Sequence, residues 1–77
     1  TVIPFSLAQS GVISINFYDI TGKLIETLVK EQVYQAGEYS VVWQGTTESG
    51  SKVASGVYMI QLKAENYVQV RKCIYIQ

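Results

Sequence analysis

Hydrophobic and polar residues alternate along most of the chain, a pattern typical of β-strands with one buried face. The first two such stretches cover residues 2–7 and 12–19. Pro4 lies within the first, and because proline has no N–H to donate to a neighbour, we expect an edge strand or pairing on one side only. No window shows a helical apolar stripe, so the pattern predicts an all-β chain. The inward positions of these two strands are Ile3, Phe5, Leu7, Ile13, Ile15 and Phe17.

A turn signal follows the second strand at residues 19–22. Asp19 can accept bonds from the backbone that follows it, and Gly22 tolerates positive φ, which together predict a type I turn with a left-handed glycine. In residues 24–29 the apolar positions do not alternate strictly. A strand, either bulged or short and twisted, is favoured over a helix, because six residues between turns are too few for a stable helix. The polar residues 30–37 are predicted to form a loop.

The second half of the chain repeats the alternation. Residues 38–45 form a predicted strand in which Trp43 is the largest side chain that the core can bury, so we place it centrally. Residues 46–51 are a polar loop, residues 52–56 are a short strand and turn, and residues 57–64 form another strand. The inward positions here are Tyr39, Val41, Trp43, Tyr58, Ile60, Leu62 and Ala64.

The last predicted strand follows a turn at Glu65 and Asn66 and leaves two alternatives for the side chains near its end. The strand starts with Val68 and Val70 opposed to Gln69 and Arg71, and continued alternation would place Lys72, Ile74 and Ile76 on the face of these valines, which is the inward one. A bulge near Arg71 and Lys72 would instead turn Cys73 and Tyr75 inward. In either case the end of the chain is expected to lie within a sheet.

About seven short strands in 77 residues predict a small antiparallel β-sandwich of immunoglobulin-like type. A partly open small barrel is the alternative architecture. We expect one domain over residues 1–77, excised from a longer chain, because the sequence starts in strand-like residues without Met.

Charge and composition narrow the classes of partner. Hydrophobic residues make up 48% of the chain and charged residues 16%, with six Lys and Arg against six Asp and Glu. This balance provides no excess of positive charge with which to bind nucleic acid. No segment is long and apolar enough for membrane insertion. The lone Cys73 cannot form an internal disulfide, so stability must come from packing.

The sequence offers no recognisable catalytic group. It contains no histidine, and its carboxylates fall in predicted turns or at strand edges, so we expect no enzyme activity, no metal site and no cofactor. Cys73 is expected to act as a small hydrophobe. Three tyrosines expected at the surface, Tyr18, Tyr34 and Tyr67, leave open a carbohydrate-binding face.

Five spaced motifs carry a family resemblance: IPFSL, FYDITGKLIETLV, AGEYSVVWQG, SGSKVASGVYMIQL and VRKCIYI. Together they resemble the C-terminal sorting domain of type IX (Por) secretion cargo, which is similar to the Ig-like domain of the flagellar hook-capping protein. Gln44 and Thr46 depart from the acidic and charged residues usual after the tryptophan and glycine. The Asn-Pro segment that usually precedes the first strand is absent. The motif residues are Tyr18, Asp19, Gly22, Gly37, Trp43, Gly45, Gly56, Tyr58 and Leu62.

The resemblance implies a non-enzymatic sorting module that directs a multidomain cargo protein through the type IX system. It places the signal in the last strand, at Lys72, Cys73, Ile74, Tyr75 and Ile76. It implies a secretion-machinery protein or a neighbouring domain of the parent chain as partner, and a route through the periplasm to the cell surface or medium. Two alternatives stay open: a structural Ig-like module that assembles into homo-oligomers through edge strands, and a carbohydrate-binding module of a secreted hydrolase.

Overall fold

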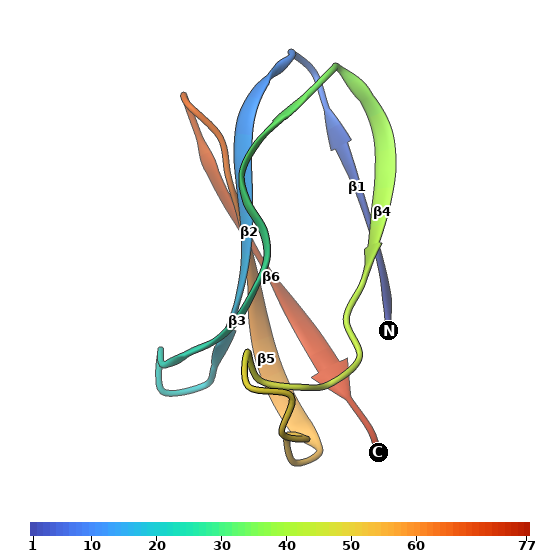
Figure 1. Cartoon of the computed structure of the whole chain (residues 1–77), viewed down its shortest axis with the longest axis vertical. Coiled ribbons are helices and arrows are strands. Elements are labelled where there is room, and N and C mark those ends of the chain that lie inside the picture. Colours follow the sequence, from blue (N-terminus) through green and yellow to red (C-terminus); the bar gives the residue numbers. More distant parts are fainter.

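Two antiparallel sheets face each other in the computed structural model, which describes all 77 residues (Figure 1). The small sheet pairs β1 with β4, and the large sheet has the order β3-β2-β5-β6. The predicted all-β sandwich is therefore confirmed, with six strands in place of about seven. The strands are β1 (Val2–Leu7), β2 (Gly11–Asp19), β3 (Leu24–Tyr34), β4 (Gly37–Val42), β5 (Gly56–Lys63) and β6 (Val68–Tyr75).

The short strand predicted at residues 52–56 does not form. Lys52 makes only an isolated bridge with Thr46. Val53 is buried, and its N–H donates to the carbonyl oxygen of Gly45 at 2.9 Å. With one apolar side chain to bury and no strand beside it, this segment crosses between the sheets as a loop.

The loop predicted at residues 30–37 is also mostly wrong, because β3 continues to Tyr34 and β4 begins at Gly37, which leaves only residues 35 and 36 between the strands. The pairing of β2 with β3 shifts register at three places, and Glu31 has a φ of 45°. Each bulge moves the alternation of side chains by one position. Residues 30–34 therefore look like a polar loop in the sequence, although their backbone is paired.

Trp43 lies at the centre of the core, just after β4, and is completely buried. Its ring stacks on Phe17 with 4.2 Å between ring centroids and meets Tyr58 edge to face at 5.1 Å. The indole N–H donates to the carbonyl oxygen of Thr46 at 3.1 Å, so the one polar atom of the ring is satisfied. The central placement predicted for this residue is confirmed. The buried apolar residues are Ile3, Phe5, Leu7, Ile13, Ile15, Phe17, Val29, Trp43, Val53, Tyr58, Ile60 and Leu62.

The hairpin between β2 and β3 has the predicted turn. Gly22 has a φ of 91°, and its N–H donates to the carbonyl oxygen of Asp19 at 3.0 Å. The Asp19 carboxylate accepts a hydrogen bond from the Thr21 hydroxyl at 2.6 Å and hydrogen bonds from the backbone N–H groups of Thr21 and Lys23 at 2.9 and 3.0 Å. These hydrogen bonds lower the pKa of Asp19, because they stabilise the ionised carboxylate, and the bond from the Thr21 hydroxyl contributes most.

Candidate partner-binding surface

The facing of residues 71–76 is decided by the register of β6. Its pairing with β5 is continuous from Val68 to Tyr75, with Tyr58 opposite Cys73. Because Tyr58 faces the core, Cys73 and Tyr75 face it too, and Lys72, Ile74 and Ile76 project from the opposite, outer side. Each alternative is therefore correct in part: β6 keeps a regular register without a bulge, and it is nevertheless Cys73 and Tyr75 that turn inward.

The same register gives an unexpected result at the start of β6. Val68 and Val70 lie on the outer face and are 52% and 57% exposed, whereas the polar Gln69 and Arg71 lie on the inner side. The Arg71 guanidinium donates to the carbonyl oxygen of Pro4 in β1. This contact spans the open side of the sandwich between the two sheets.

The inner side of β6 contacts the core through an aromatic ring. The ring of Tyr75 lies 5.2 Å from that of Trp43, measured between centroids, and against the backbone of Gly45. Gly45 has a φ of 70°, and a Cβ atom added there would overlap the Tyr75 ring. Only glycine therefore fits this position, both for its backbone and for its neighbour.

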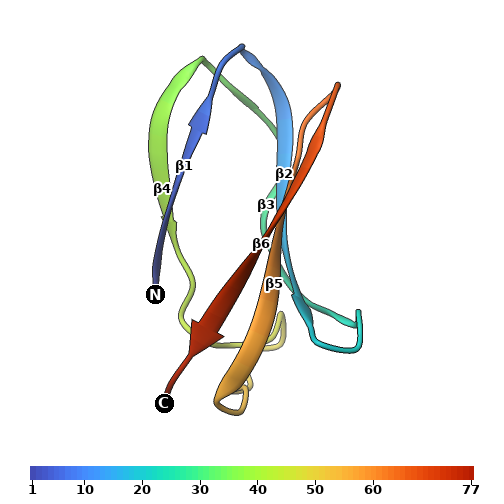
Figure 2. The ribbon, with the colours of Figure 1, turned by 180° about the vertical axis from the view of Figure 1, so that it is seen from behind.

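Beyond β6 the chain stays in contact with the crossing loop. The Gln77 side-chain amide donates to the carbonyl oxygen of Val53 at 2.6 Å, and the Gln77 backbone N–H donates to the Ser55 hydroxyl at 2.9 Å. The N and C ends of the chain lie on the same side of the molecule (Figure 2). The expected placement of this end within the folded sheet structure agrees with these contacts.

Cys73 is half-buried and packs against the core. Burial raises the pKa of its thiol, since desolvation penalises the thiolate. The thiolate is the reactive form of cysteine, so this environment favours a packing role over a nucleophilic one.

The five residues of the predicted signal therefore divide into two sets. Cys73 and Tyr75 are partly buried and pack against the core. Lys72, Ile74 and Ile76 are exposed, and the two isoleucines expose 64% and 79% of their surface. Val68 and Val70 lie on the same outer face and extend this exposed surface along the strand. Unbroken alternation through Lys72 was the sequence signal that could have indicated that these two valines share the face of Lys72.

The motif residues that carried the family resemblance lie in turns, in the core or in side-chain contacts of the sheet. Gly37 adopts a φ of 149° at the start of β4, and Tyr58 and Leu62 are buried in β5. Tyr18 donates its hydroxyl to the Gln61 side-chain oxygen at 3.2 Å on the outer face. A Cβ atom at Gly56 would meet no other atom within 4 Å, and the φ of Gly56 is not positive, so this motif glycine is required neither by close packing nor by its backbone conformation.

The comparison with protein families matches residues 4–67 to the FlgD Ig-like domain. The chain belongs to this family. No curated protein and no solved structure matches the chain. The matched residues of the FlgD Ig-like domain run from β1 through the turn after β5, so β6 lies outside the matched segment.

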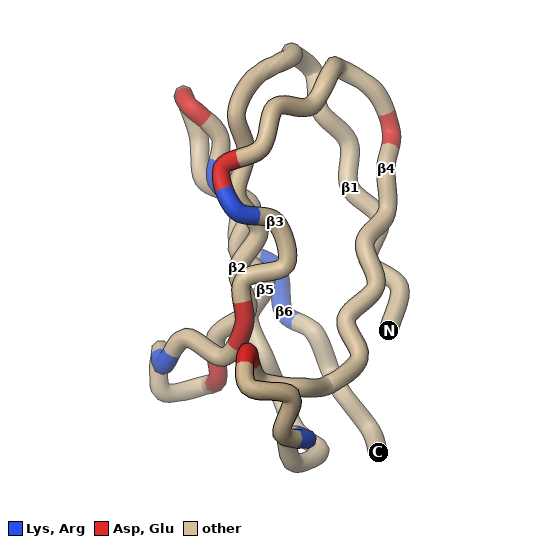
Figure 3. Tube along the Cα trace, viewed as in Figure 1, with Lys and Arg blue, Asp and Glu red and all other residues tan.

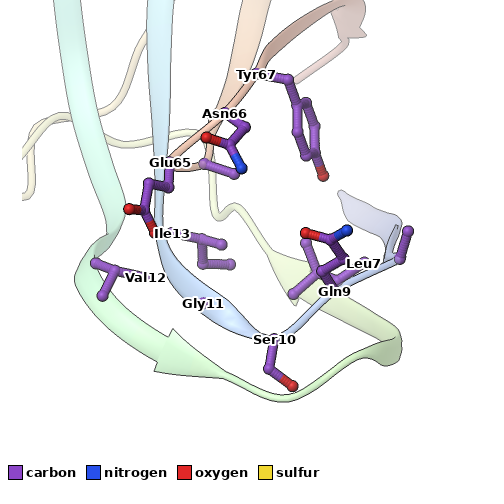
Figure 4. Close-up of a pocket in the computed structure, with 11 residues that line it drawn as sticks. Leu7, Gln9, Ser10, Gly11, Val12, Ile13, Glu65, Asn66 and Tyr67 are labelled. Atoms are coloured by element: carbon purple, nitrogen blue, oxygen red, sulfur yellow. The ribbon is translucent and has the colours of Figure 1, made fainter.

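A pocket of about 290 Å³ opens at one end of this Ig-like domain, between the β1–β2 and β5–β6 turns (Figure 4). Leu7, Ile13 and Ala64 supply apolar lining, and the side chains of Gln9, Asn66 and Tyr67 lie around the cavity. Tyr67 is 44% exposed, as expected.

The other two tyrosines considered for a carbohydrate face lie elsewhere. Tyr34, expected at the surface, is half-buried, because its ring packs against those of Tyr39 and Phe5, with 4.9 and 6.0 Å between ring centroids. Tyr18 pairs with Met59, whereas Tyr67 follows Lys63 beyond the other end of β5. The three rings therefore do not form one platform for a sugar.

The structure contains no helix that could cross a lipid bilayer. It brings together no group of three or more His, Cys, Asp or Glu side chains with the arrangement of a metal site.

Proposed function

We propose that this FlgD-type Ig-like domain is a non-enzymatic sorting module of an exported multidomain protein. In this proposal a component of the type IX secretion machinery recognises the outer residues of the 72–76 segment. The cargo then passes through the periplasm to the cell surface or the medium.

The observation that carries the proposal is the division of this segment into two faces. Tyr75 packs beside Trp43, so the backbone of the segment is fixed by the core. The same backbone presents Lys72, Ile74 and Ile76 to solvent. An exposed hydrophobic group on a rigid strand can bind a partner with little loss of conformational entropy, which favours recognition.

The second support is the position of β6 in the sheet. It is the last strand of the order β3-β2-β5-β6, so one side of its backbone has no strand paired to it. Edge strands are a common site for recognition by other proteins.

Deletion of residues 72–77 would be an ambiguous test, because it also removes the core contact of Tyr75 and the bonds of Gln77. A sharper variant combines Lys72→Ser, Ile74→Thr and Ile76→Thr, which changes only the outer side chains. We expect a carrier protein fused to this variant to remain in the periplasm of a bacterium with a type IX system, while the unaltered fusion is exported.

The matched control replaces exposed valines elsewhere, Val2, Val33 and Val42, with threonine. Export of this control should be normal, and thermal unfolding of both purified domains should confirm that they fold. Normal export of the 72/74/76 variant would contradict the proposal.

A structural module that assembles through edge strands is the second candidate, favoured by membership of the FlgD Ig-like family and by the exposed valines and isoleucines of β6. Sedimentation of the purified domain over a range of concentrations distinguishes it. Reversible, concentration-dependent assembly that the 72/74/76 variant abolishes would favour the structural module over the sorting module.

A further inference from the structure

We infer that β6 binds its partner by strand addition, pairing its free backbone edge with an extended segment that carries an acidic residue between apolar ones. This inference rests on the proposed function for the choice of segment. It adds how that segment is recognised and what chemistry the partner must have.

The other edges of the sandwich are less suited to accept a strand. In β1, Pro4 lacks an N–H group, and β3 is bulged, with Glu31 in a left-handed conformation. Proline and bulges are the devices by which edge strands resist further pairing. The six-residue β4 is shorter than the eight-residue β6 and carries the acidic Glu38. Only β6 combines greater length with a continuous register and no proline.

The direction of the free backbone groups follows from the hairpin between β5 and β6. The Ala64 N–H donates to the carbonyl oxygen of Tyr67 at 2.9 Å, so these two residues form a hydrogen-bonded pair. Such pairs alternate with non-bonded pairs in an antiparallel ladder. With Val68 opposite Lys63, the N–H and C=O groups of Val68, Val70, Lys72 and Ile74 point away from β5, toward the open edge.

The outer face beside that edge has a definite chemistry. On β5 the cross-strand neighbours of Val70, Lys72 and Ile74 are Gln61, Met59 and Val57, and farther along Lys63 lies opposite Val68. Neither strand contains an acidic residue. Figure 3 shows the cations of β6 midway along the strand, with acidic residues on β3, β4 and the connecting loops. A partner strand with an acidic residue beside Lys72 and apolar residues beside Val70 and Ile74 complements this face.

A second copy of β6 is the less suitable occupant. Centred antiparallel pairing of two β6 strands would bring Arg71 and Lys72 of one copy beside those of the other. Like charges opposite each other destabilise a sheet pair. Dimerisation through β6 is therefore an outcome that would count against the inference.

The direct test is amide hydrogen exchange with a synthetic probe. The probe is the extended peptide Thr-Val-Thr-Glu-Thr-Val-Thr, acetylated and amidated, and the control peptide has Lys in place of Glu. Without peptide, the amides of Val70, Lys72 and Ile74 should exchange faster than those of Arg71 and Cys73, which point toward β5. The probe should slow exchange at the first three positions. An unchanged exchange pattern at saturating or millimolar probe would overturn the inference.

The role of charge is measured by comparing affinities. Cross-strand pairs of opposite charge differ modestly from pairs of like charge, so we expect the Glu peptide to bind about threefold or more tightly than the Lys peptide. Lys72→Glu should reverse this preference. Equal affinities in both proteins would exclude the acidic partner.

A backbone variant separates this inference from the proposed function. Val70→Pro removes one outward N–H, whereas Val70→Thr keeps it, and thermal unfolding shows whether each variant folds. Loss of probe binding and of export in the folded Pro variant alone supports strand addition. If the 72/74/76 variant blocks export but the folded Pro variant is exported normally, sorting stands and strand addition is wrong. If the Pro variant does not fold, the exchange experiment on the unaltered domain decides.

Discussion

The two edges of the four-stranded sheet, β3 and β6, are built differently. β3 is eleven residues long, shifts register against β2 at three places and contains a non-glycine residue at positive φ. β6 pairs with β5 without interruption and carries exposed apolar side chains on its outer face.

This difference shows where the fold resists additional pairing. A bulged strand twists and leaves an irregular row of backbone groups, which a neighbouring chain cannot match over any length. A regular strand keeps an evenly repeating edge. In β6 the cations Arg71 and Lys72 are the only charged residues that oppose indiscriminate pairing, so this edge can select a partner by charge.

The largest expected effect concerns the contact that fixes β6. Gly45→Ala places a methyl group into the Tyr75 ring and forces alanine to a φ of 70°. Backbone strain and overpacking together should cost about 2 to 4 kcal/mol of unfolding free energy. Gly56→Ala is the matched control, because open space surrounds its Cβ position and its φ is not positive.

Chemical denaturation of both variants measures this difference. A loss of stability in the Gly45 variant similar to that of the Gly56 variant would mean that Tyr75 does not fix β6 to the core. The distinction between a packed inner face and an available outer face of β6 would then fail.

A smaller effect of opposite sign is expected at the bulge in β3. Glycine adopts a φ of 45° without the strain that glutamate incurs there, so Glu31→Gly should stabilise the domain by about 0.5 to 1 kcal/mol. In the neighbouring Gln32→Gly variant, glycine in an ordinary strand position should instead destabilise by about 0.5 to 1 kcal/mol. Equal destabilisation by both changes, measured by urea unfolding, would show that the bulge at Glu31 does not persist in solution.

The smallest effect is expected at the hairpin that starts β3. The folded state lowers the pKa of Asp19 below its usual 3.8 through bonds from Thr21 and Lys23. This contribution to stability is complete above that usual value and disappears as the pH falls through the lowered pKa. The Tm of Asp19→Ala should therefore be lower than that of the unaltered protein at neutral pH, and the gap should narrow in strong acid.

Thermal melts from neutral pH to strong acid test this expectation. Asp19→Asn should lie between the two proteins, since its side-chain oxygen still accepts hydrogen bonds without a charge. A Tm gap that does not change with pH would contradict the proposed stabilisation of the ionised carboxylate.

Sequence reasoning succeeded where alternation is unbroken and the side chains are large. The inward faces of β1, β2 and β5 and the burial of Trp43 were all predictable, because a strand with one apolar face can satisfy it only against a core. The turn at Asp19 and Gly22 was predictable for a different reason. Its geometry depends on local backbone preferences that each residue carries with it.

Sequence reasoning failed at both edges of the large sheet. In β3 the bulge near Glu31 disguised a paired strand as a loop. In β6 the alternation was regular, but the apolar Val68 and Val70 proved to be on the outer face. The polarity of side chains normally indicates which face of a strand is buried. This indication is unreliable for an edge strand such as β6, because the core covers only part of it.

The amino-acid sequence by itself determined the all-β class, the central indole and the main hairpin turn, because each follows from alternation, side-chain size or local conformational preference. Only the tertiary structure decided which side of β6 meets the core, and so which of residues 72–76 are available to a partner. That choice depends on Tyr75 packing against Gly45 and Trp43, a contact between segments some thirty residues apart that no local pattern specifies.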